Sequence, residues 1–502
     1  MSWLPLFSRL IAICWLAVAT FDSVDGAEHP RVIIVGAGAA GIAAASRLYR
    51  GGITNILLLE ASQRVGGRVH TRPFGDGIVD LGAQWCHGEQ GNVVYELASV
   101  YPDLLKSSVV LEDIKLIRSD GTPVPDALVT RLTNLTEHIN ELDERKTFAG
   151  SLGEFFTQKY WHILQTDEAF GDVSAELAEQ FLTYHHDQLR GYEAYESWFE
   201  VSAGDADKYE ESEGNQALAW NSVKGFSTIL DIVSGNYPNS VNETLTPVPL
   251  DDIINYGRFV SNIHWIQTPN ENVVVTTEDG SRYEADHVIS TVSLGVLKEN
   301  HHTMFTPALP PVNQRAITGI YFGMVNKVFL LFDTPIPDGL PSTVQLLWNK
   351  PDLDALRKSK HSWAESVSTL FRVDHQPNVL AAWLVGMEGG RAELLPDEVI
   401  QEGVLHLLGM FAKDFSFGTI EDVLRSDWSS NRLFRGSYSS RSMTTDKMRT
   451  GPQDLANPLN NASNEPVVLF AGEATSLKRY STVHGAIESG FREADRLLEL
   501  YQ

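Results

Sequence analysis

The stretch that decides the fold covers residues 31–69 and reads RVIIVGAGAAGIAAASRLYRGGITNILLLEASQRVGGRV. It starts with a short β-branched run, Val32–Val35, which predicts a buried parallel strand. Three glycines in the spacing G-x-G-x-x-G follow this strand: Gly36, Gly38 and Gly41. The first glycine allows a tight turn, the second lets a pyrophosphate approach the backbone, and the third lets a helix pack closely. Small residues from Ala39 and Ala40 onward suit that helix, whose N-terminal N–H groups would face the phosphates.

A second apolar strand is expected at Ile56–Leu59, and it ends in Glu60. A carboxylate at this place can accept hydrogen bonds from both ribose hydroxyls, and it would repel a 2′-phosphate. A lone glycine motif is a weak signal, and a chance glycine-rich turn is the alternative. Here strand, glycine turn, helix, strand and acid follow one another in order, so the segment predicts dinucleotide binding.

The residues after Glu60 separate NAD from FAD. The pattern E-x-x-x-R-x-G-G-R is completed by Arg64, Gly66, Gly67 and Arg68. Paired glycines let the backbone approach a ligand and two arginines can pair with its pyrophosphate, while a basic surface turn is the alternative. With this motif the chain resembles the flavin-dependent amine oxidase family, which includes monoamine, polyamine and L-amino-acid oxidases. The resemblance covers nearly all of the chain after about residue 30 and implies FAD as the cofactor.

The resemblance also implies the fold class, an α/β chain with the two-domain flavin amine oxidase fold. In this fold a Rossmann-like FAD-binding domain is assembled from separated segments, and an α+β domain binds the substrate. Strand signals at 273–277 and 467–473 and a closing helix at about 485–500 agree with such an assembly. The expected ranges are 27–112, 242–300 and 415–502 for the FAD-binding domain and 113–241 and 301–414 for the substrate-binding domain.

The family's cofactor contacts can be carried over one position at a time. Residues 80–85 resemble the segment that passes the flavin ring, Val260 the valine that holds the adenine, and Trp428 a wall of the ring. Glu473 resembles the acid that reaches the ribityl and phosphate region, and residues 482–486 resemble the helix start that faces the pyrimidine end. The implied FAD contacts are Gly36, Gly38, Ala39, Ala40, Gly41, Glu60, Arg68, Gly82, Ala83, Gln84, Trp85, Val260, Trp428, Gly472, Glu473, Thr482 and Val483.

Lys327 interrupts an otherwise apolar strand, 325–332. The family places a lysine here that is linked through a water to the flavin N5, so the resemblance implies a catalytic role in imine hydrolysis or reoxidation. The alternative is a lysine that extends its ammonium to the surface while its stem packs in the strand.

His87 narrows the substrate class. The sequence Trp-Cys-His-Gly at 85–88 resembles animal-type spermine and acetylpolyamine oxidases, and a histidine there could bind a substrate nitrogen or tune its protonation. A structural histidine is the alternative. Tyr438 matches one tyrosine wall of the monoamine oxidases, whereas Thr482 stands at the second wall. This threonine and the lack of a cysteine near the C-terminus favour a polyamine oxidase with non-covalent FAD.

The function implied is FAD-dependent oxidation of polyamines, namely spermine, spermidine or acetylated forms. A hydride passes to the flavin N5, and the products are an aldehyde, a shorter amine and H2O2. The expected partners are a small polyamine and O2, with no metal, and the oligomeric state stays open. Two alternatives also stay open: an oxidase of L-amino acids or other amines, and a secreted flavin-fold binding protein with little turnover.

The N-terminus resembles a signal peptide over residues 1–26, because Arg9 precedes the apolar run Leu10–Ala19 and small residues stand at −3 and −1 of a cleavage site. The sequons at Asn134, Asn242 and Asn461 fit secretion. No span is expected after signal removal, although a retained anchor is an alternative. Apart from a cysteine inside the signal, Cys86 is the one cysteine, so no intramolecular disulfide can form, and we expect Cys86 to be a small buried residue.

The chain of 502 residues carries a formal charge of −26. Removing the signal deletes one arginine and two aspartates, so −26 becomes −25. A negative field argues against nucleic acid as a partner and would attract polycations. Plain solubility is the other interpretation of this charge.

Overall fold

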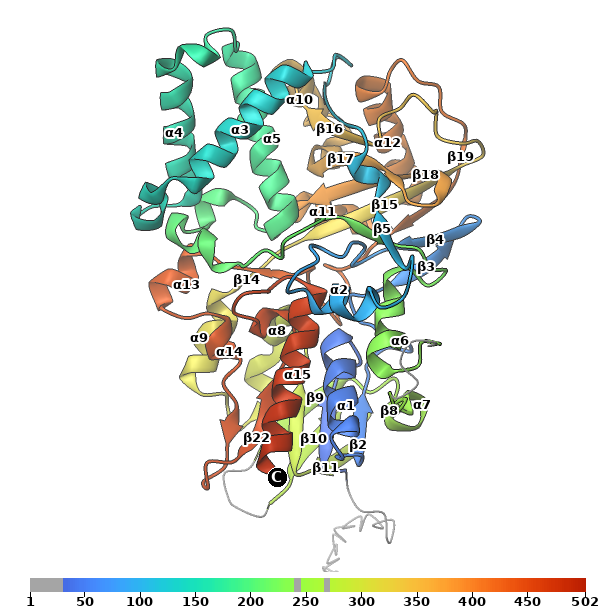
Figure 1. Ribbon diagram of the computed structural model, residues 1–502, viewed down its shortest axis with the longest axis vertical. Helices are drawn as coiled ribbons and strands as arrows, with labels where there is room; N and C mark the ends of the chain where they lie inside the picture. Colours follow the sequence, from blue (N-terminus) through green and yellow to red (C-terminus); the bar gives the residue numbers. More distant parts are fainter. Residues whose placement is uncertain (1–29, 239–244, 266–270) are drawn as a thin grey trace, which may run out of the picture.

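The computed structural model describes residues 30–238, 245–265 and 271–502. Figure 1 shows two halves stacked along the long axis. The lower half holds the C-terminus and two long helices that lie side by side, α1 (Ala39–Arg50) and α15 (Val483–Leu500). The upper half holds a large sheet with helices on both sides. The signal-peptide prediction and the sequon at Asn242 lie outside the described residues.

The lower half is built on a six-stranded sheet in the order β21-β22-β12-β1-β2-β8. Its strands are β1 (Val32–Val35), β2 (Ile56–Leu59), β8 (Ile254–Asn255), β12 (His287–Ser290), β21 (Leu459–Asn460) and β22 (Pro466–Phe470). All neighbours are parallel except the β21–β22 pair. The parallel strands come from three distant parts of the chain, as an assembly from separated segments requires.

Strand β1 lies in the middle of this sheet and its residues are buried on both faces. Val32 and Ile34 pack with α1, whereas Ile33 and Val35 pack on the other side. That other side is a second sheet in the order β11-β10-β9-β13 together with two helices. These elements are β9 (Val260–His264), β10 (Val273–Thr277), β11 (Arg282–Ala285), β13 (Phe305–Thr306), α8 (Leu294–Met304) and α9 (Pro311–Gly319). A continuous apolar run in β1 therefore reflects burial on two faces.

The upper half is built on a six-stranded sheet in the order β19-β15-β18-β17-β16-β6. Its strands are β6 (Ile114–Arg118), β15 (Val325–Phe332), β16 (Thr343–Leu347), β17 (Val367–Val373), β18 (Gln376–Val385) and β19 (Ile420–Arg425). Helix α5 (Ala175–Glu193) packs on β16, β17 and β18, with α3 (Asp126–Glu141) and α4 (Leu152–Thr166) beyond it. The apolar faces of α10 (Lys350–Leu356) and α12 (Asp397–Phe411) share a separate core with the sheet, and α11 (Gly386–Arg391) contacts β15 and β18.

The other helices and strands are short. They are α2 (Val93–Ala98), α6 (Thr228–Ser234), α7 (Leu250–Ile253), α13 (Met443–Met448), α14 (Pro452–Leu455), β3 (Thr71–Phe74), β4 (Gly77–Asp80), β5 (Leu105–Ser107), β7 (Leu218–Trp220), β14 (Tyr321–Phe322) and β20 (Ser439–Ser440). No helix in the described ranges has the length and apolar character needed to cross a bilayer. The same ranges bring together no group of three His, Cys, Asp or Glu side chains suited to a metal ion.

The fold class agrees with the expectation, and the exact domain ranges stay a prediction. Two elements lie across the expected boundaries. Strand β19, inside the range 415–502 expected for the FAD-binding domain, pairs with β15 in the upper sheet. Helix α6, inside the range 113–241 expected for the substrate-binding domain, packs on α1.

Candidate active site

A cavity of about 790 Å³ is lined by residues of both halves. It takes in the residues that the sequence singled out for cofactor, substrate or catalysis, with the exceptions of Gly41 and Arg64. A Cβ on Gly41 would lie 1.9 Å from the carbonyl oxygen of Gly36, so this glycine serves the close packing of α1 on the turn. The sequence therefore predicted the walls of one cavity from segments that are hundreds of residues apart.

Glu60 is held rigidly at the end of β2. One of its carboxylate oxygens accepts a hydrogen bond from the backbone N–H of Ala37 and the other from that of Ser62, both at 2.8 Å. Each oxygen keeps a lone pair for a further donor. Nearby Gly36 has φ +103°, a conformation that glycine adopts without strain. A ribose with two free hydroxyls fits this arrangement.

The two arginines of the second motif have different roles. Arg64 does not line the cavity, because its guanidinium donates to the backbone oxygens of Val65, Gly67 and Val69 and braces the glycine turn. The expectation that both arginines are available to a pyrophosphate is therefore wrong for Arg64. Arg68 does line the cavity.

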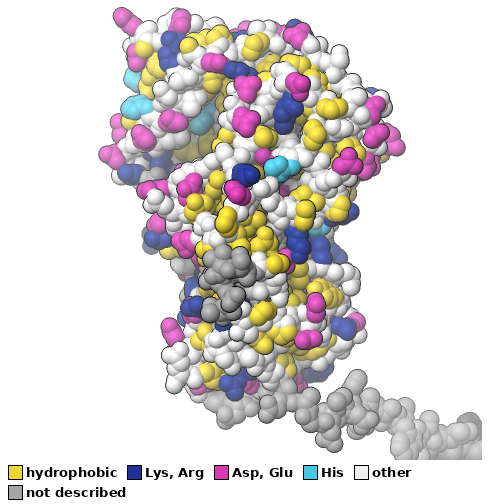
Figure 2. Space-filling model, turned by 45° about the vertical axis from the view of Figure 1, so that its right-hand side comes forward, with side chains coloured by type: hydrophobic (Ala, Val, Ile, Leu, Met, Phe, Trp, Pro, Cys, Tyr) yellow, Lys and Arg dark blue, Asp and Glu magenta, His cyan; other side chains and the backbone are white. Residues whose placement is uncertain are grey.

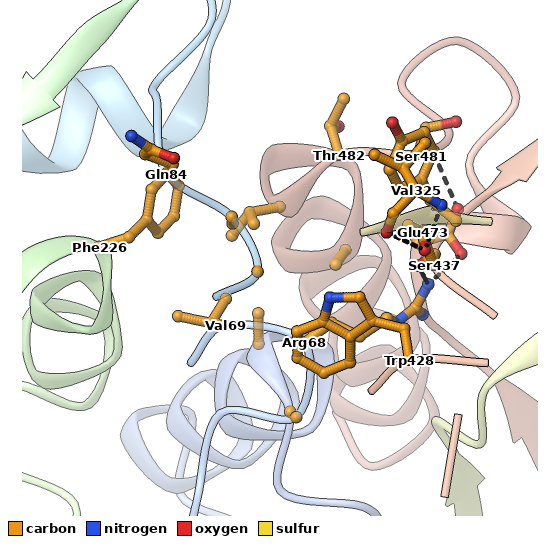
Figure 3. Close-up of a pocket in the computed structure, with 18 of the residues that line it drawn as sticks. Arg68, Val69, Gln84, Phe226, Val325, Trp428, Ser437, Glu473, Ser481 and Thr482 are labelled. Atoms are coloured by element: carbon orange, nitrogen blue, oxygen red, sulfur yellow. Dashed lines mark hydrogen bonds and ion pairs between the residues drawn. The ribbon is translucent and has the colours of Figure 1, made fainter. Parts of the chain in front are cut away.

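Glu473 links residues from separate parts of the chain, and Figure 3 shows it with its partners Arg68 and Ser481. Its carboxylate forms an ion pair with Arg68 at 2.9 Å and accepts hydrogen bonds from the Ser439 hydroxyl and the Ser481 N–H, at 2.5 and 2.9 Å. The neighbouring Gly472 has φ +121°, and a Cβ there would meet no atom within 4 Å. The backbone at Gly472 therefore faces open space, which suits close approach of a ligand.

Helix α15 directs its N-terminus into the same cavity through Thr482 and Val483. The Thr482 hydroxyl caps the helix by accepting from the N–H of Gly485 at 3.1 Å. The first N–H groups of a helix and its dipole favour a ligand with partial negative charge, such as a carbonyl oxygen.

Lys327 is 3% exposed, so the alternative that it extends to the surface is wrong. Its Nζ donates to the carbonyl oxygens of Asp80 and Gly82 at 2.9 and 2.7 Å and to Oε1 of Gln84 at 2.7 Å. Three acceptors use all three N–H groups of an ammonium. Burial lowers the pKa of Lys327, while the nearby Asp80 carboxylate raises it. Lys327 thus fixes the segment that the resemblance places against the flavin ring.

His87 presents one ring nitrogen to the cavity in a defined state. Its Nδ1 lies 2.6 Å from the carbonyl oxygen of Gln216. A carbonyl can only accept, so Nδ1 carries the proton and Nε2 keeps its lone pair. Burial lowers the pKa of His87, although the ring remains accessible from the cavity. A neutral imidazole with a free Nε2 can accept a proton or a hydrogen bond from an amine.

An aromatic wall lies beside Lys327. The rings of Trp85 and Trp383 are stacked at 5.8 Å, and Phe371 packs against both. Nζ of Lys327 lies 5.2 Å from the centre of the Trp383 ring. Tyr438 also lies in this region, and its hydroxyl donates to the carbonyl oxygen of Gly191 on α5. Tyr438 and Thr482 both line the cavity, so the structure brings the two expected substrate walls together.

Three carboxylates on this side of the cavity were not predicted as site residues: Asp187, Glu193 and Glu211. Burial raises the pKa of Glu193 to about 7, and the neighbouring Glu211 adds to this shift. The sequence does contain an acidic run at 209–213, yet of its glutamates only Glu211 lines the cavity. No local pattern marks Glu193 or Asp187, since helix α5 also carries the exposed acids Glu176 and Glu179.

The parallel sheet, the acid that ends β2 and the helix N-terminus at one cavity define a dinucleotide-binding protein. The family model described as flavin containing amine oxidoreductase matches residues 39–498, and the chain belongs to this family. Similar proteins include the peroxisomal N(1)-acetyl-spermine/spermidine oxidase of Homo sapiens, 30% identical over 499 residues and covering 94% of this chain and 95% of that protein. Polyamine oxidase 1 of Oryza sativa subsp. japonica is 29% identical over 523 residues, with 95% and 98% covered.

Among solved structures, wild-type putrescine oxidase bound to putrescine has a TM-score of 0.64 at 18% identity and covers 94% of this chain and 99% of that chain. This likeness confirms the two-domain fold. The chain is an oxidoreductase that acts on a small-molecule amine and O2.

The residues present fit FAD. Glu60 suits the ribose, Gly472 leaves room for a ligand against its backbone, and the cavity continues to the N-terminus of α15. The cofactor is bound non-covalently. Cys86, the free cysteine of the described chain, is buried as expected, and burial raises the pKa of its thiol to about 12. A thiol in that state is a poor nucleophile.

Proposed function

We propose that this chain is a polyamine oxidase that converts a secondary amine of spermine, spermidine or an acetylated form into an aldehyde and a shorter amine. The observation that carries the proposal is the grouping of Glu193 and Glu211 with a neutral His87 along one cavity wall. Carboxylates beside a hydrogen-bond acceptor suit a substrate with several cationic nitrogens. The names of the relatives from Homo sapiens and Oryza sativa support this assignment.

Bound FAD supplies the acceptor for the hydride that leaves the substrate carbon, and O2 then takes up the two electrons to give H2O2. The reacting nitrogen must be uncharged, because a protonated nitrogen has no lone pair to support loss of the hydride. Nε2 of His87 keeps a lone pair that can accept this nitrogen's proton. The aromatic wall of Trp85 and Trp383 excludes water around the reacting carbon.

Lys327 keeps the segment 80–84 in place. We propose that it also positions the water that hydrolyses the imine product, for which one of its three N–H groups must leave its present acceptor. In the complete reaction one amine, one O2 and one H2O give one aldehyde, one shorter amine and one H2O2. The protein's contribution is alignment and desolvation, since the cofactor carries the redox chemistry.

The alternative of an L-amino-acid oxidase requires a cation for the substrate carboxylate. Among the described residues that line the cavity, the Lys and Arg side chains are already engaged. Arg68 pairs with Glu473, Arg258 pairs with Asp279, and Lys327 donates three hydrogen bonds. The side chains of the cavity thus favour an amine without a carboxylate.

A substrate panel with mass analysis of the products tests the proposal. We expect H2O2 together with an aldehyde and a shortened amine from spermine or its acetylated form, and neither from L-amino acids. A keto acid from an L-amino acid, with no product from any polyamine, would support the amino-acid oxidase instead. No product from any amine, despite bound flavin, would support a binding protein.

We further propose that the chain is secreted after removal of residues 1–26. Asn134 is exposed on α3, and the amide nitrogen of Asn461 donates to Glu465 at 2.9 Å. Expression of the full chain in a secreting cell, with N-terminal sequencing and glycosidase treatment of the medium, checks this. Recovery of the protein only inside the cell, with residues 1–26 intact, would contradict it.

A further inference from the structure

The cavity continues past the aromatic wall into an arm between α5 and the upper sheet, here called the amide arm and defined by Gln188, Gln345 and Thr369. Gln188 is on α5, whereas Gln345 and Thr369 are directly paired residues of β16 and β17. Oε1 of Gln345 accepts from Nε2 of Gln188 at 2.7 Å and from the Thr369 hydroxyl at 2.8 Å. Figure 1 shows α5 beside these strands in the upper half.

These contacts leave one atom of each amide without a protein partner. In the described part of the chain, nothing accepts a hydrogen bond from Nε2 of Gln345 and nothing donates to Oε1 of Gln188, although Gln345 is only 7% exposed. If both amides were assigned the other way round, the pair would still present one donor and one acceptor. Gln188 and Gln345 both line the cavity, so the arm offers a ligand one donor and one acceptor and is complementary to a group that both accepts and donates.

The carboxylate beside the amide arm is paired with a guanidinium. Asp187 is the carboxylate next to Gln188, and its Oδ1 pairs with Nη1 of Arg190 at 3.0 Å. Arg190 also pairs with Glu196 at 3.3 Å, so two carboxylates share one guanidinium. The side chains that define the arm are the amides of Gln188 and Gln345 and the hydroxyl of Thr369. An ammonium contains donors alone and would leave the amide N–H of Gln345 unpaired, whereas a secondary amide satisfies both ends of the glutamine pair.

The amide arm is close enough to the reaction site to hold the far end of the same substrate molecule. Gly191, one helical turn after Gln188 and about 4.5 Å along the helix axis, receives the Tyr438 hydroxyl. A Cβ on Gly191 would lie 3.3 Å from Nε1 of Trp383, whose ring is next to Lys327. A chain that runs along Trp383 thus reaches Gln188 and Gln345.

We propose that the amide arm binds an uncharged secondary amide at the end of the amine substrate, so that the enzyme selects amines acylated at that end. The Gln188–Gln345 pair is the specificity determinant: one amide N–H meets the acyl carbonyl, and one amide oxygen meets the acyl N–H. This inference rests on the proposed polyamine oxidase function.

The test compares spermine with N1-acetylspermine on the flavin-loaded enzyme. We expect the wild type to show the higher kcat/KM for the acetylated amine. Gln188→Leu should lower kcat/KM for N1-acetylspermine about 10-fold, mainly through KM, since one lost hydrogen bond of ordinary strength corresponds to that factor. The same variant should change kcat/KM for spermine less than about 3-fold. Thr369→Val removes one hydrogen bond that orients Gln345, so it should also lower kcat/KM for N1-acetylspermine. This variant tests the inference if Gln188→Leu does not bind flavin.

Two further variants separate amide from ammonium recognition. Gln188→Glu is isosteric and adds a charge, so it should shift preference toward spermine. Asp187→Asn should affect both substrates by a similar factor, because both carry cationic nitrogens. Glu196→Gln removes the second partner of Arg190 outside the cavity and controls for effects that act through Arg190.

Three results would overturn the inference: no wild-type preference for the acetylated amine, equal effects of Gln188→Leu on both amines, or a loss in Asp187→Asn that is confined to spermine. The last result would assign the arm to a terminal ammonium. In each case the wild type still oxidises polyamines, so the proposed function stands. Failure of the proposed function is a different outcome, in which neither amine yields H2O2 or an aldehyde.

Discussion

At the scale of single residues, the structure changes what Lys327 is expected to do. Its ammonium is buried and holds the backbone of Asp80 and Gly82 and the side chain of Gln84. A lysine that interrupts an apolar strand could be predicted as unusual from the sequence. Its three acceptors could not, because they lie more than 240 residues away along the chain.

Lys327→Met should retain FAD and lower turnover about 10-fold or more, the scale of a lost positioned polar group. FAD is retained because Glu60 and the glycine turn do not contact Lys327. Flavin absorbance after gel filtration and steady-state rates measure the two effects. Lys298→Met is a matched control, because Lys298 also donates to two backbone oxygens, Ile317 and Thr318, but does not line the cavity. Wild-type turnover in Lys327→Met would show that the lysine serves packing alone.

Glu193 should give the enzyme a pH-dependent step near pH 7. Burial raises the pKa of Glu193 to about 7 from an ordinary 4.5. The carboxylate is therefore charged only above that pH, and kcat/KM for cationic amines should rise through it. Glu193→Gln should remove this step. The folded state binds the proton more tightly than the unfolded state, so this group's stabilising effect is present below pH 4.5 and is lost as the pH rises through 7.

Thermal unfolding tests the expected effect of Glu193 ionisation on stability. Glu193→Gln should raise Tm relative to the wild type more at pH 8 than at pH 5, because only at pH 8 does the wild type bury a charge. An equal change at both pH values would show that Glu193 titrates normally.

At the scale of elements, the helix pair that forms the floor of the cofactor site depends on glycine. A Cβ on Gly490 of α15 would lie 2.2 Å from the carbonyl oxygen of Ala40 and 3.0 Å from the Cβ of Ala43. The sequence predicted the small residues of α1 and a closing helix that ends at Leu500. It could not predict that the two helices touch, since hundreds of residues separate them. The sequence also could not predict that β19 pairs in the upper sheet or that α6 packs on α1 in the lower half.

Gly490→Ala should therefore lower the stability by about 1–3 kcal/mol, the usual range for overpacking, and weaken FAD retention. Gly409→Ala in α12 is a matched control, because a Cβ there meets nothing within 4 Å. That variant should be neutral or slightly stabilising, since alanine is the better helix former. Equal Tm values for the two variants would contradict the close α1–α15 contact.

At the scale of the whole molecule, the formal charge of −26 should act on encounter with the substrate. Figure 2 shows Asp and Glu side chains spread over the visible face rather than gathered at one place. Since screening shortens such a field to about 8 Å at physiological ionic strength, kcat/KM for a tetra-amine should fall as salt rises. A mono-amine, if oxidised at all, should respond less. If kcat/KM depended equally on salt for the two amines, long-range attraction between the negative protein and the polyamine would have no role.

The cofactor half of the cavity was largely predictable because its backbone motifs are local. The glycine turn, Glu60 and the helix start at Thr482 each belong to a sequence pattern only a few residues long. The substrate half of the cavity was not predictable. Glu193, Gln188 and Gln345 form part of a site only because helix α5 packs on the upper sheet. A site made from side chains of distant elements leaves no short pattern in the sequence.

The most direct test of the central claim, oxidation of polyamines by bound FAD, is the flavin spectrum under anaerobic conditions. Mixing the purified enzyme with spermine or N1-acetylspermine without O2 should bleach the visible absorption band of the flavin within the turnover time, about 0.1 s at a median enzyme rate, and admitting O2 should restore it. L-amino acids should leave the band unchanged. Bleaching by amino acids alone, or a band that no amine changes, would contradict the account.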